Sequence, residues 1–382
     1  MTGADLGRRA AQAGEAALAG VDRAALPGFM RRLDEAALLA MAATLHGAGA
    51  FVDGRAHTTD QVADLLRVAV RHRWILRRWL TVLTREGWLR HDDDTGRHHH
   101  LRPASRADLA AATRDLDAAR AGLGYPAAMT RFFTTSAEHL PELLRDEIPL
   151  QALLFADDDL ATAEAAYKDN VINGYLNAVA GRVLGDLAGR RRGPEPLRVL
   201  ELGAGVGGTT ADVLPALADR PVVYQFTDVS RFFLEAARER FAGYGFLRYG
   251  LFDINADVLR QGVPAGSQDV LLAANVAHNA VDVTRLLGGL RDLLAADGVL
   301  LLIESCREHH QIATSMQFLM SARPGVPAAG SADLRASTDR IFLTREQWLT
   351  QLTAAGFTPM LCLPTVDDPL AALGQHVFVA GR

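Results

Sequence analysis

VLELGAGVGGTT, residues 199–210, is the stretch of sequence that decides the fold. An apolar run leads into a turn with four glycines, and a helical pattern follows. Glycine lets the backbone approach a ligand closely, and the N-terminus of the next helix offers free N–H groups. The stretch therefore predicts the first strand, turn and helix of a nucleotide-binding α/β domain. A glycine-rich turn alone also fits a nicotinamide cofactor, so its surroundings decide between cofactors.

Downstream of this turn, short apolar runs alternate with helical patterns up to the C-terminus. The runs read RVLEL, VVYQFT, FLRYGLFDI, DVLLAANV, VLLLIES, FTPMLCLP and HVFVAG. Such alternation predicts a mostly parallel, Rossmann-like sheet of seven strands with helices on both faces. Only a short loop separates the last two runs, so we expect them to pair antiparallel at one edge of the sheet.

Four segments are expected along the chain. Residues 1–30 are rich in alanine and glycine and predict a loosely held helical arm. Residues 31–104 contain three helical patterns and then two short strand patterns around a turn, the order of a winged helix. Residues 105–192 predict a helical linker that covers the pocket, and residues 193–382 form the α/β domain.

Composition narrows the function classes. The formal net charge of the 382 residues is −5, so no global basic field calls for nucleic acid or an anionic membrane. Cys306 and Cys362 are the two cysteines, and they form no CxxC pair. The sequence has no run of 18 apolar residues and no apolar leader at its N-terminus. We therefore expect a cytoplasmic protein without a membrane segment.

Acidic residues follow the first three predicted strands. Glu201 lies just before the glycines, Asp228 follows the second strand and Asp253 ends the third. The carboxyl ends of parallel strands meet at one edge of such a sheet, where ligands bind. There a carboxylate such as Asp228 can accept hydrogen bonds from two ribose hydroxyls, and Asp253 can meet an adenine amino group.

The motifs ELGAGVGGTT, QFTDVSRFFLEAARERF, LFDI and AANVAHNA occur in this order, after LLRDEIPLQALLF and AEAAYKDN upstream. Over roughly residues 34–382, this series resembles the C-methyltransferase domains of polyketide and nonribosomal peptide synthases. These are class I methyltransferases that depend on S-adenosylmethionine (SAM). The resemblance implies that SAM is the cofactor. It also implies a set of residues that contact SAM: Glu201, Gly203, Gly205, Asp228, Asp253 and Asn275.

The same resemblance implies a catalytic pair, His278 and Glu304. His278 lies just past the fourth strand and Glu304 ends the fifth, so their side chains can converge on one pocket. In the resembling family, a histidine and a glutamate at these places deprotonate an activated carbon. Neutral imidazole is a competent base near pH 7, and a carboxylate fixes its tautomer.

The expected enzyme is a free-standing, homodimeric C-methyltransferase of secondary metabolism. Its substrate would be a carrier-bound β-ketoacyl or peptidyl thioester or a related small ketone. Residues 311–343 are expected to form a loop over the mouth of the substrate pocket. The pocket residues assigned from the sequence are Tyr167, Tyr175, Asn279 and Phe318.

Three alternatives stay open from the sequence. The first is metal-assisted methylation of the β-carbon of an α-keto acid, with His278 and His309 or His310 as ligands; a metal is not the favoured reading. The second is O- or N-methylation of a small molecule. The most distant is a SAM-binding regulator that reads DNA through four arginines of the third helix, and the three carboxylates in the wing argue against it. These arginines are Arg71, Arg73, Arg77 and Arg78.

Overall fold

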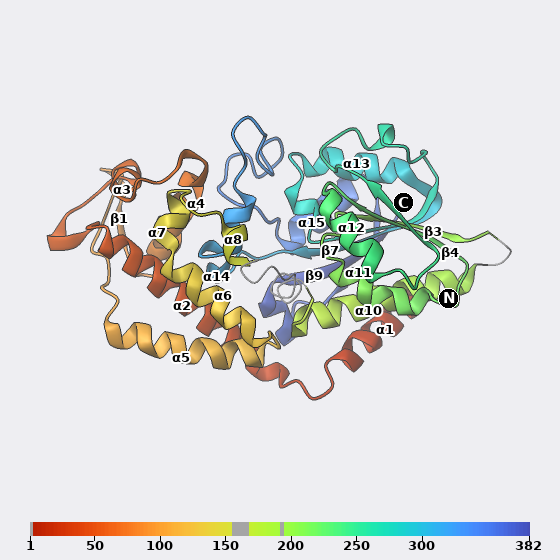
Figure 1. Ribbon diagram of the computed structural model, residues 1–382, viewed down its shortest axis with the longest axis horizontal. Helices are drawn as coiled ribbons and strands as arrows, with labels where there is room; N and C mark the ends of the chain where they lie inside the picture. The colour runs from red at the N-terminus through yellow and green to blue at the C-terminus, as the bar shows by residue number, and fades with distance from the viewer. Residues whose placement is uncertain (1–2, 155–167, 192–194) are drawn as a thin grey trace.

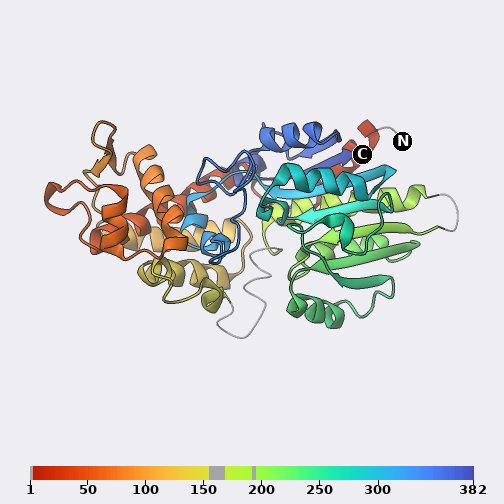
Figure 2. The same cartoon turned by 90° about the horizontal axis from the view of Figure 1, so that it is seen from above.

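The computed structural model describes residues 3–154, 168–191 and 195–382. Two lobes lie side by side along the long axis of the molecule (Figures 1 and 2). We call them the helical lobe, built on α2 to α8, and the sheet lobe, built on the strands β3 to β9. None of the helices in these ranges combines the length and apolarity needed to cross a membrane.

The sheet lobe confirms the predicted seven strands, in the order β5-β4-β3-β6-β7-β9-β8. Neighbours from β5 to β7 pair parallel, while β9 runs antiparallel to both β7 and β8, as predicted for the edge. The order reverses between β3 and β6, which is where ligands bind in such sheets. The bounds are β3 Leu197–Leu202, β4 Val222–Asp228, β5 Leu247–Leu251, β6 Gln268–Ala274, β7 Leu294–Ser305, β8 Thr358–Leu363 and β9 Gln375–Gly381.

Helices cover both faces of the sheet because its inner strands are apolar on both sides. In β6, Val270 and Leu272 pack into one hydrophobic cluster, and Leu271 and Ala273 pack into the other. The first cluster includes α10 (Val171–Arg190), α11 (Gly208–Val213) and α12 (Arg231–Arg240). The second includes α13 (Val283–Leu293) and α15 (Arg345–Ala354). Helix α13 ends at Leu293, and the residues that follow it begin β7.

The first helix, α1 (Gly3–Ala17), corrects the expectation of a loosely held arm. It lies against α10 under the sheet lobe (Figure 1), with Leu6 and Ala10 buried in the main core. Arg9 also pairs with Asp186 at 2.8 Å. The small residues that suggested looseness instead let two helices approach closely, since a Cβ on Gly14 would lie 2.5 Å from the ring of Tyr175.

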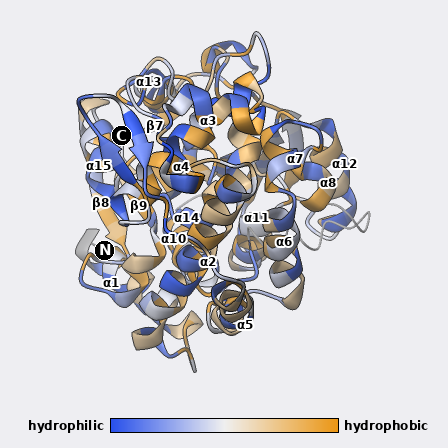
Figure 3. Cartoon of the chain, turned by 90° about the vertical axis from the view of Figure 1, so that its left-hand side faces the viewer, coloured by the Kyte–Doolittle hydropathy of each residue, from blue (hydrophilic) through white to orange (hydrophobic). Residues whose placement is uncertain are grey.

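The first half of the helical lobe has the element order predicted for residues 31–104. Thr58 caps the second of these helices in a reciprocal capping box with Gln61. In Figure 3 helices of this lobe carry both hydrophobic (orange) and hydrophilic (blue) residues. The bounds are α2 Leu26–Gly47, α3 Thr59–Leu66, α4 Arg73–Arg85, β1 Arg90–Asp92 and β2 Arg97–His99.

The four arginines considered for DNA contact are engaged within the chain. Each forms an ion pair with a nearby carboxylate, which leaves it poorly suited to neutralise phosphates. The pairs are Arg71–Asp146, Arg73–Asp64, Arg77–Asp339 and Arg78–Glu308.

The segment after β7 joins the two lobes. It leaves the sheet, and α14 (His310–Ala313) packs against α2 and α4 of the helical lobe. Trp79 donates a hydrogen bond from Nε1 to the carbonyl of Ala313 at 2.9 Å, and His72 and Trp74 both contact the hydroxyl of Ser321 at 2.8 Å. The lobe is completed by α5 Arg106–Gly122, α6 Ala127–Glu138, α7 Leu140–Leu144 and α8 Leu150–Leu154.

Candidate active site

A histidine and a glutamate meet where two parallel strands end. His278 lies on the short turn 277–279 after β6, and Glu304 is near the end of β7, the parallel neighbour of β6. Nδ1 of His278 lies 2.7 Å from Oε2 of Glu304. Only 4% of His278 and 0% of Glu304 is exposed, so this pair is shielded from water. The structure therefore brings together the two residues predicted to be catalytic.

The second oxygen of Glu304 is fixed by the backbone. Oε1 accepts hydrogen bonds from the N–H groups of Val276 at 3.1 Å and Ala277 at 2.7 Å. A carboxylate can only accept, so its partner Nδ1 of His278 carries the proton. Nε2, on the other side of the ring, then presents a lone pair. This is the tautomer that a general base needs.

A cavity of about 270 Å³ adjoins His278. The ring of Phe342 stands edge-on to His278, with 4.9 Å between centroids, and forms part of the wall. Most of the remaining wall is apolar or aromatic and comes from the helical lobe and the segment after β7: Tyr125, Met129, Phe133, Ile312, Met316, Leu319 and Met320. Six polar side chains complete the wall: Asn173, Asn275, Asn279, Ser305, Gln311 and Gln375. Such a cavity suits a substrate that has both apolar and polar groups, with its reactive group placed at His278.

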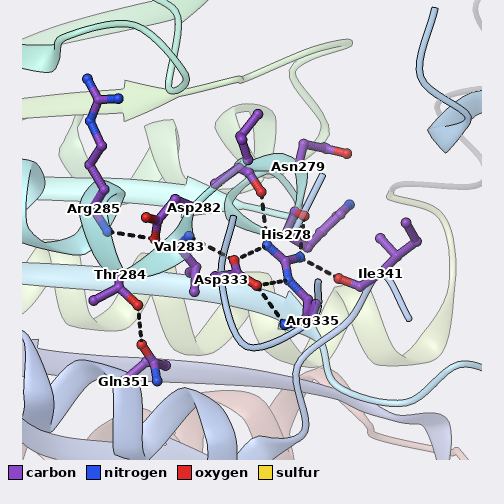
Figure 4. Close-up of polar contacts among 12 residues, drawn as sticks. His278, Asn279, Asp282, Val283, Thr284, Arg285, Asp333, Arg335, Ile341 and Gln351 are labelled. Carbon is purple, nitrogen blue, oxygen red and sulfur yellow. Dashed lines mark hydrogen bonds and ion pairs between the residues drawn. The ribbon is translucent and has the colours of Figure 1, made fainter. Parts of the chain in front are cut away.

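An arginine links the loop before α15 to the turn that carries His278 (Figure 4). Nη1 of Arg335 donates to the carbonyls of His278 at 2.7 Å and Ile341 at 2.6 Å, and Nη2 donates to Ala280 at 2.9 Å. Asp333 neutralises this buried guanidinium, with Oδ2 at 2.7 Å from Nη2, and also accepts from the N–H of Val283. The predicted loop over the pocket is thus fastened to the backbone that carries His278.

The glycine turn after β3 is built to leave room for a ligand. Gly203 and Gly205 have φ of +56° and +55°, a region that favours glycine. A Cβ on Gly203 would lie 2.2 Å from the side chain of Val276, whereas one on Gly205 would point into open space. The N–H of Gly205 donates to Oδ2 of Asp228 at 2.9 Å, and the N–H of Ser230 donates to Oδ1 at 2.8 Å.

The other predicted cofactor residues differ in exposure. Glu201 is 1% exposed, and its Oε2 accepts from Thr210 and Tyr224; burial raises the pKa of Glu201 to about 7. Asn275 has a left-handed φ of +51° and lines the catalytic cavity. Asp253 is exposed, and its Oδ1 accepts from the N–H of Asn255. The open space beside Gly205 lies next to the carboxylate of Asp228, and this arrangement fits the ribose and methionine parts of SAM.

Two of the four predicted pocket residues are corrected. Asn279 lines the cavity, but Tyr175 is packed between α10 and α1, and Phe318 is buried edge-on to His72. Both face packed side chains, because the apolar pattern of their segments does not show which side is covered. Tyr167 lies outside the described residues. The walls contributed by α6, such as Met129, were missed, since no local signal points to them.

The histidines proposed as metal ligands with His278 do not converge. Nδ1 of His309 lies 3.1 Å from Asp34, and Nε2 of His310 lies 3.2 Å from Glu86, so both turn toward the helical lobe. Among the described residues, no three His, Cys, Asp or Glu side chains are grouped to hold a metal. The alternative of a metal held by His278 with His309 or His310, which was not the favoured one, therefore finds no support among the described residues.

The chain is similar to known methyltransferases. Residues 200–300 match the family model described as a methyltransferase domain. The chain is 36% identical over 353 residues to pyochelin synthetase PchF of Pseudomonas aeruginosa, an alignment that covers 91% of this chain and 19% of PchF. The chain thus spans about a fifth of that relative.

Two solved carbon methyltransferases are similar along nearly the whole chain. The CurJ carbon methyltransferase is 27% identical, with a TM-score of 0.87 over 99% of this chain and 98% of its own. The DszA carbon methyltransferase is 26% identical, with a TM-score of 0.78 over 92% of this chain and 88% of its own. The similarity includes both lobes, not the sheet alone.

Proposed function

Because the chain is a class I SAM-dependent methyltransferase, similar to carbon methyltransferase domains of polyketide and nonribosomal peptide synthases, we propose that it methylates an activated carbon next to a carbonyl. One observation carries this proposal. Glu304 fixes the tautomer of His278, and the ring lines a cavity in which a carbon acid can lie. SAM, when bound, supplies the electrophilic methyl group of its sulfonium.

The residues proposed to hold SAM surround the ends of β3, β4 and β6. Asp228 would accept from the ribose hydroxyls, and Gly203 and Gly205 would let the backbone approach the methionine part. Asn275 is the member of this set that also lines the catalytic cavity, so it marks where the two sites meet. Glu201 would support the turn from below through Thr210 and Tyr224.

His278 does the acid–base work in this proposal. Nε2 takes a proton from the carbon between two carbonyl groups. Nδ1 keeps its own proton and donates it in a hydrogen bond to Glu304. The charge that develops on imidazole is stabilised by the buried carboxylate. Glu304 itself needs no movement, since two backbone N–H groups hold its other oxygen. General-base help of this kind contributes about 10²- to 10⁴-fold in rate.

The proposed substrate is a β-ketoacyl or peptidyl thioester attached to a carrier protein. Two observations support a carrier-bound acyl chain: the wall includes three methionines and three phenylalanine or tyrosine rings, and the relative PchF is by name a synthetase. A homodimer formed through the N-terminal helices of residues 31–104 stays a prediction, which light scattering of the purified protein tests.

Methyl transfer from SAM with a deuterated methyl group tests the reaction. The purified protein is given a panel of β-keto thioesters, α-keto acids and phenols, and fragmentation of the product locates the label. We expect the label on carbon of a β-keto thioester. Label on oxygen or nitrogen would keep the fold and cofactor but discard carbanion chemistry.

The variant His278→Ala tests the base separately. Turnover should fall at least about a hundredfold on the magnitude of general-base catalysis, while S-adenosylhomocysteine binds as before. Unchanged turnover would show that another group removes the proton.

A further inference from the structure

A cavity of about 90 Å³ lies within the helical lobe, beside the catalytic cavity. Its wall comes from α2, α5, α6 and α14, and the first three of these helices pack against one another (Figure 1). The two cavities share Phe133 and Gln311, so these side chains stand between them. We call the smaller cavity the alanine pocket, because five of its twelve lining residues are alanines: Ala36, Ala37, Ala40, Ala112 and Ala137.

One face of α6 runs past both cavities. Met129 lines the catalytic cavity, Phe133 lines both, and Ala137 lines the alanine pocket. Residues spaced by four lie one above another on a helix, so these three follow each other along about 12 Å of its axis. A substrate chain that starts at His278 and follows α6 therefore reaches the alanine pocket once it has passed Phe133.

The polar side chains of the alanine pocket use their donors within the protein. Thr134 donates from Oγ1 to the carbonyl of Thr130 at 2.9 Å, and Thr314 donates to the carbonyl of Gln311 at 3.0 Å. Nε2 of Gln311 donates to the hydroxyl of Ser315 at 2.8 Å. The other nine lining residues are alanine, leucine or phenylalanine. Because a polar group buried without a partner costs free energy, such a wall suits an occupant without polar groups.

Small side chains keep the alanine pocket open. α2 presents Ala36, Ala37 and Ala40 to it, and a longer side chain at any of these positions would take up the space. Protein interiors are close-packed, and a cavity between helices forfeits dispersion contacts. An alkyl group that enters the pocket gains these contacts, and it leaves water at the same time.

We propose that the alanine pocket holds the far end of a straight alkyl chain carried by the substrate, and that Phe133 sets the chain length at which the substrate reaches it. This rests on the proposed function, in which the β-keto group lies beside His278. It narrows the substrate class to β-ketoacyl groups with a linear aliphatic tail, in preference to groups with an aromatic tail. Each methylene that enters the pocket should tighten binding about fourfold.

Calorimetry with analogues of graded length tests this without any methyl transfer. The 3-oxobutanoyl, 3-oxohexanoyl, 3-oxooctanoyl and 3-oxodecanoyl thioesters of N-acetylcysteamine are titrated into the intact protein saturated with S-adenosylhomocysteine. Affinity should rise with chain length, by about fourfold per methylene, and then level off. In Ala40→Leu and Ala112→Leu the new side chain occupies the pocket. Their affinity should level off at a shorter chain, while the butanoyl compound binds as it does to the unaltered protein.

Three comparisons separate the alanine pocket from a general loss of structure. Ala43→Leu makes the same exchange on α2 but outside the pocket wall, and it should leave the affinity at every chain length unchanged. Phe133→Leu removes part of the side chain between the cavities, so it should raise the affinity for the decanoyl compound relative to that for the butanoyl compound. Affinity for S-adenosylhomocysteine should be equal in all variants.

Two results would overturn the proposal. One is a chain-length profile that Ala40→Leu and Ala112→Leu leave unchanged; if light scattering then shows an altered oligomeric state, this surface of α2 and α5 belongs to a contact between two copies of the chain. The other is an aromatic analogue, the 3-oxo-5-phenylpentanoyl thioester, that binds more tightly than the decanoyl compound and loses affinity in the same variants.

The proposed function can fail separately from this proposal. Methyl label on oxygen or nitrogen would discard carbanion chemistry but leave the chain-length result standing, because calorimetry requires no methyl transfer. Failure of all the thioesters to bind would overturn both the proposed substrate and the role of the alanine pocket.

Discussion

Replacing Glu304 by glutamine exchanges one oxygen of the carboxylate for an NH₂ group and tests the proposed roles of Glu304 and His278 in catalysis. Oε1 accepts from two backbone N–H groups, so the glutamine oxygen should stay there. The new NH₂ group then faces Nδ1 of His278, which must accept instead of donate. The proton moves to Nε2, and the ring can no longer take a proton from substrate. Glu304→Gln thus inverts the tautomer with little change in shape.

The expected magnitudes follow from the three hydrogen bonds. General-base help is lost, so the single-turnover rate should fall about 10²- to 10⁴-fold. Three charge-assisted hydrogen bonds become neutral, at about 1 kcal/mol each, so the free energy of unfolding should fall by about 3 kcal/mol. Affinity for S-adenosylhomocysteine should be unchanged.

Rapid-quench methyl transfer and denaturant unfolding measure these two quantities, and ¹⁵N chemical shifts of His278 report its tautomer. Glu308→Gln is a matched control. Glu308 also accepts from two backbone N–H groups with one oxygen, Ile341 and Phe342, but its other oxygen meets Arg78 and not a histidine. The Glu308→Gln variant should have a lower free energy of unfolding but retain most of its turnover. A Glu304→Gln rate within about threefold of the unaltered protein would refute the tautomer argument.

Three further predictions concern binding, the loop and pH. Asp228→Ala should lower the affinity for S-adenosylhomocysteine about 10- to 100-fold, as measured by calorimetry, and Asp253→Ala should lower it far less. The reverse order would contradict the assignment of Asp228 to the ribose. Arg335→Ala leaves the buried carboxylate of Asp333 without its cationic partner, although backbone N–H groups still donate to it, so the free energy of unfolding should fall by about 3 kcal/mol. Trypsin should also cut beside the loop sooner, and an unchanged digestion pattern would contradict the role given to Arg335. Burial lowers the pKa of His376 from 6.5 to about 4, so the unfolded chain takes up a proton that the folded chain refuses, and stability falls as pH drops through this window. His376→Leu should remove up to about 3 kcal/mol of that loss, measured by urea unfolding at pH 7 and at about pH 4.5.

The sheet was predictable because each strand carries its own signal. A buried parallel strand is a short apolar run in the sequence. Glu201, Asp228 and Glu304 lie at or near the carboxyl ends of such strands, and these ends share one edge of the sheet. The contact between His278 and Glu304 follows from two neighbouring strand ends. These parts of the site depend on local pattern and topology alone.

The pocket wall was not predictable in the same way. Met129 and Phe342 reach the cavity through packing between distant segments, which no local period encodes. Tyr175 was misplaced because α10 is apolar on most sides, so the pattern cannot tell which side faces the cavity. For α1, alanine and glycine indicated weak packing, whereas Gly14 permits the close approach on which the packing depends.

The way Arg335 holds the catalytic turn bears on how new specificities can arise. Its guanidinium meets carbonyl oxygens of His278, Ala280 and Ile341, groups that every residue type possesses. The side chain of Asn279, between two of these anchors, is exposed and lines the cavity without taking part in the tie. Position 279 is therefore a site where mutation can alter substrate preference while the loop and the base stay in place, a natural starting point for laboratory evolution.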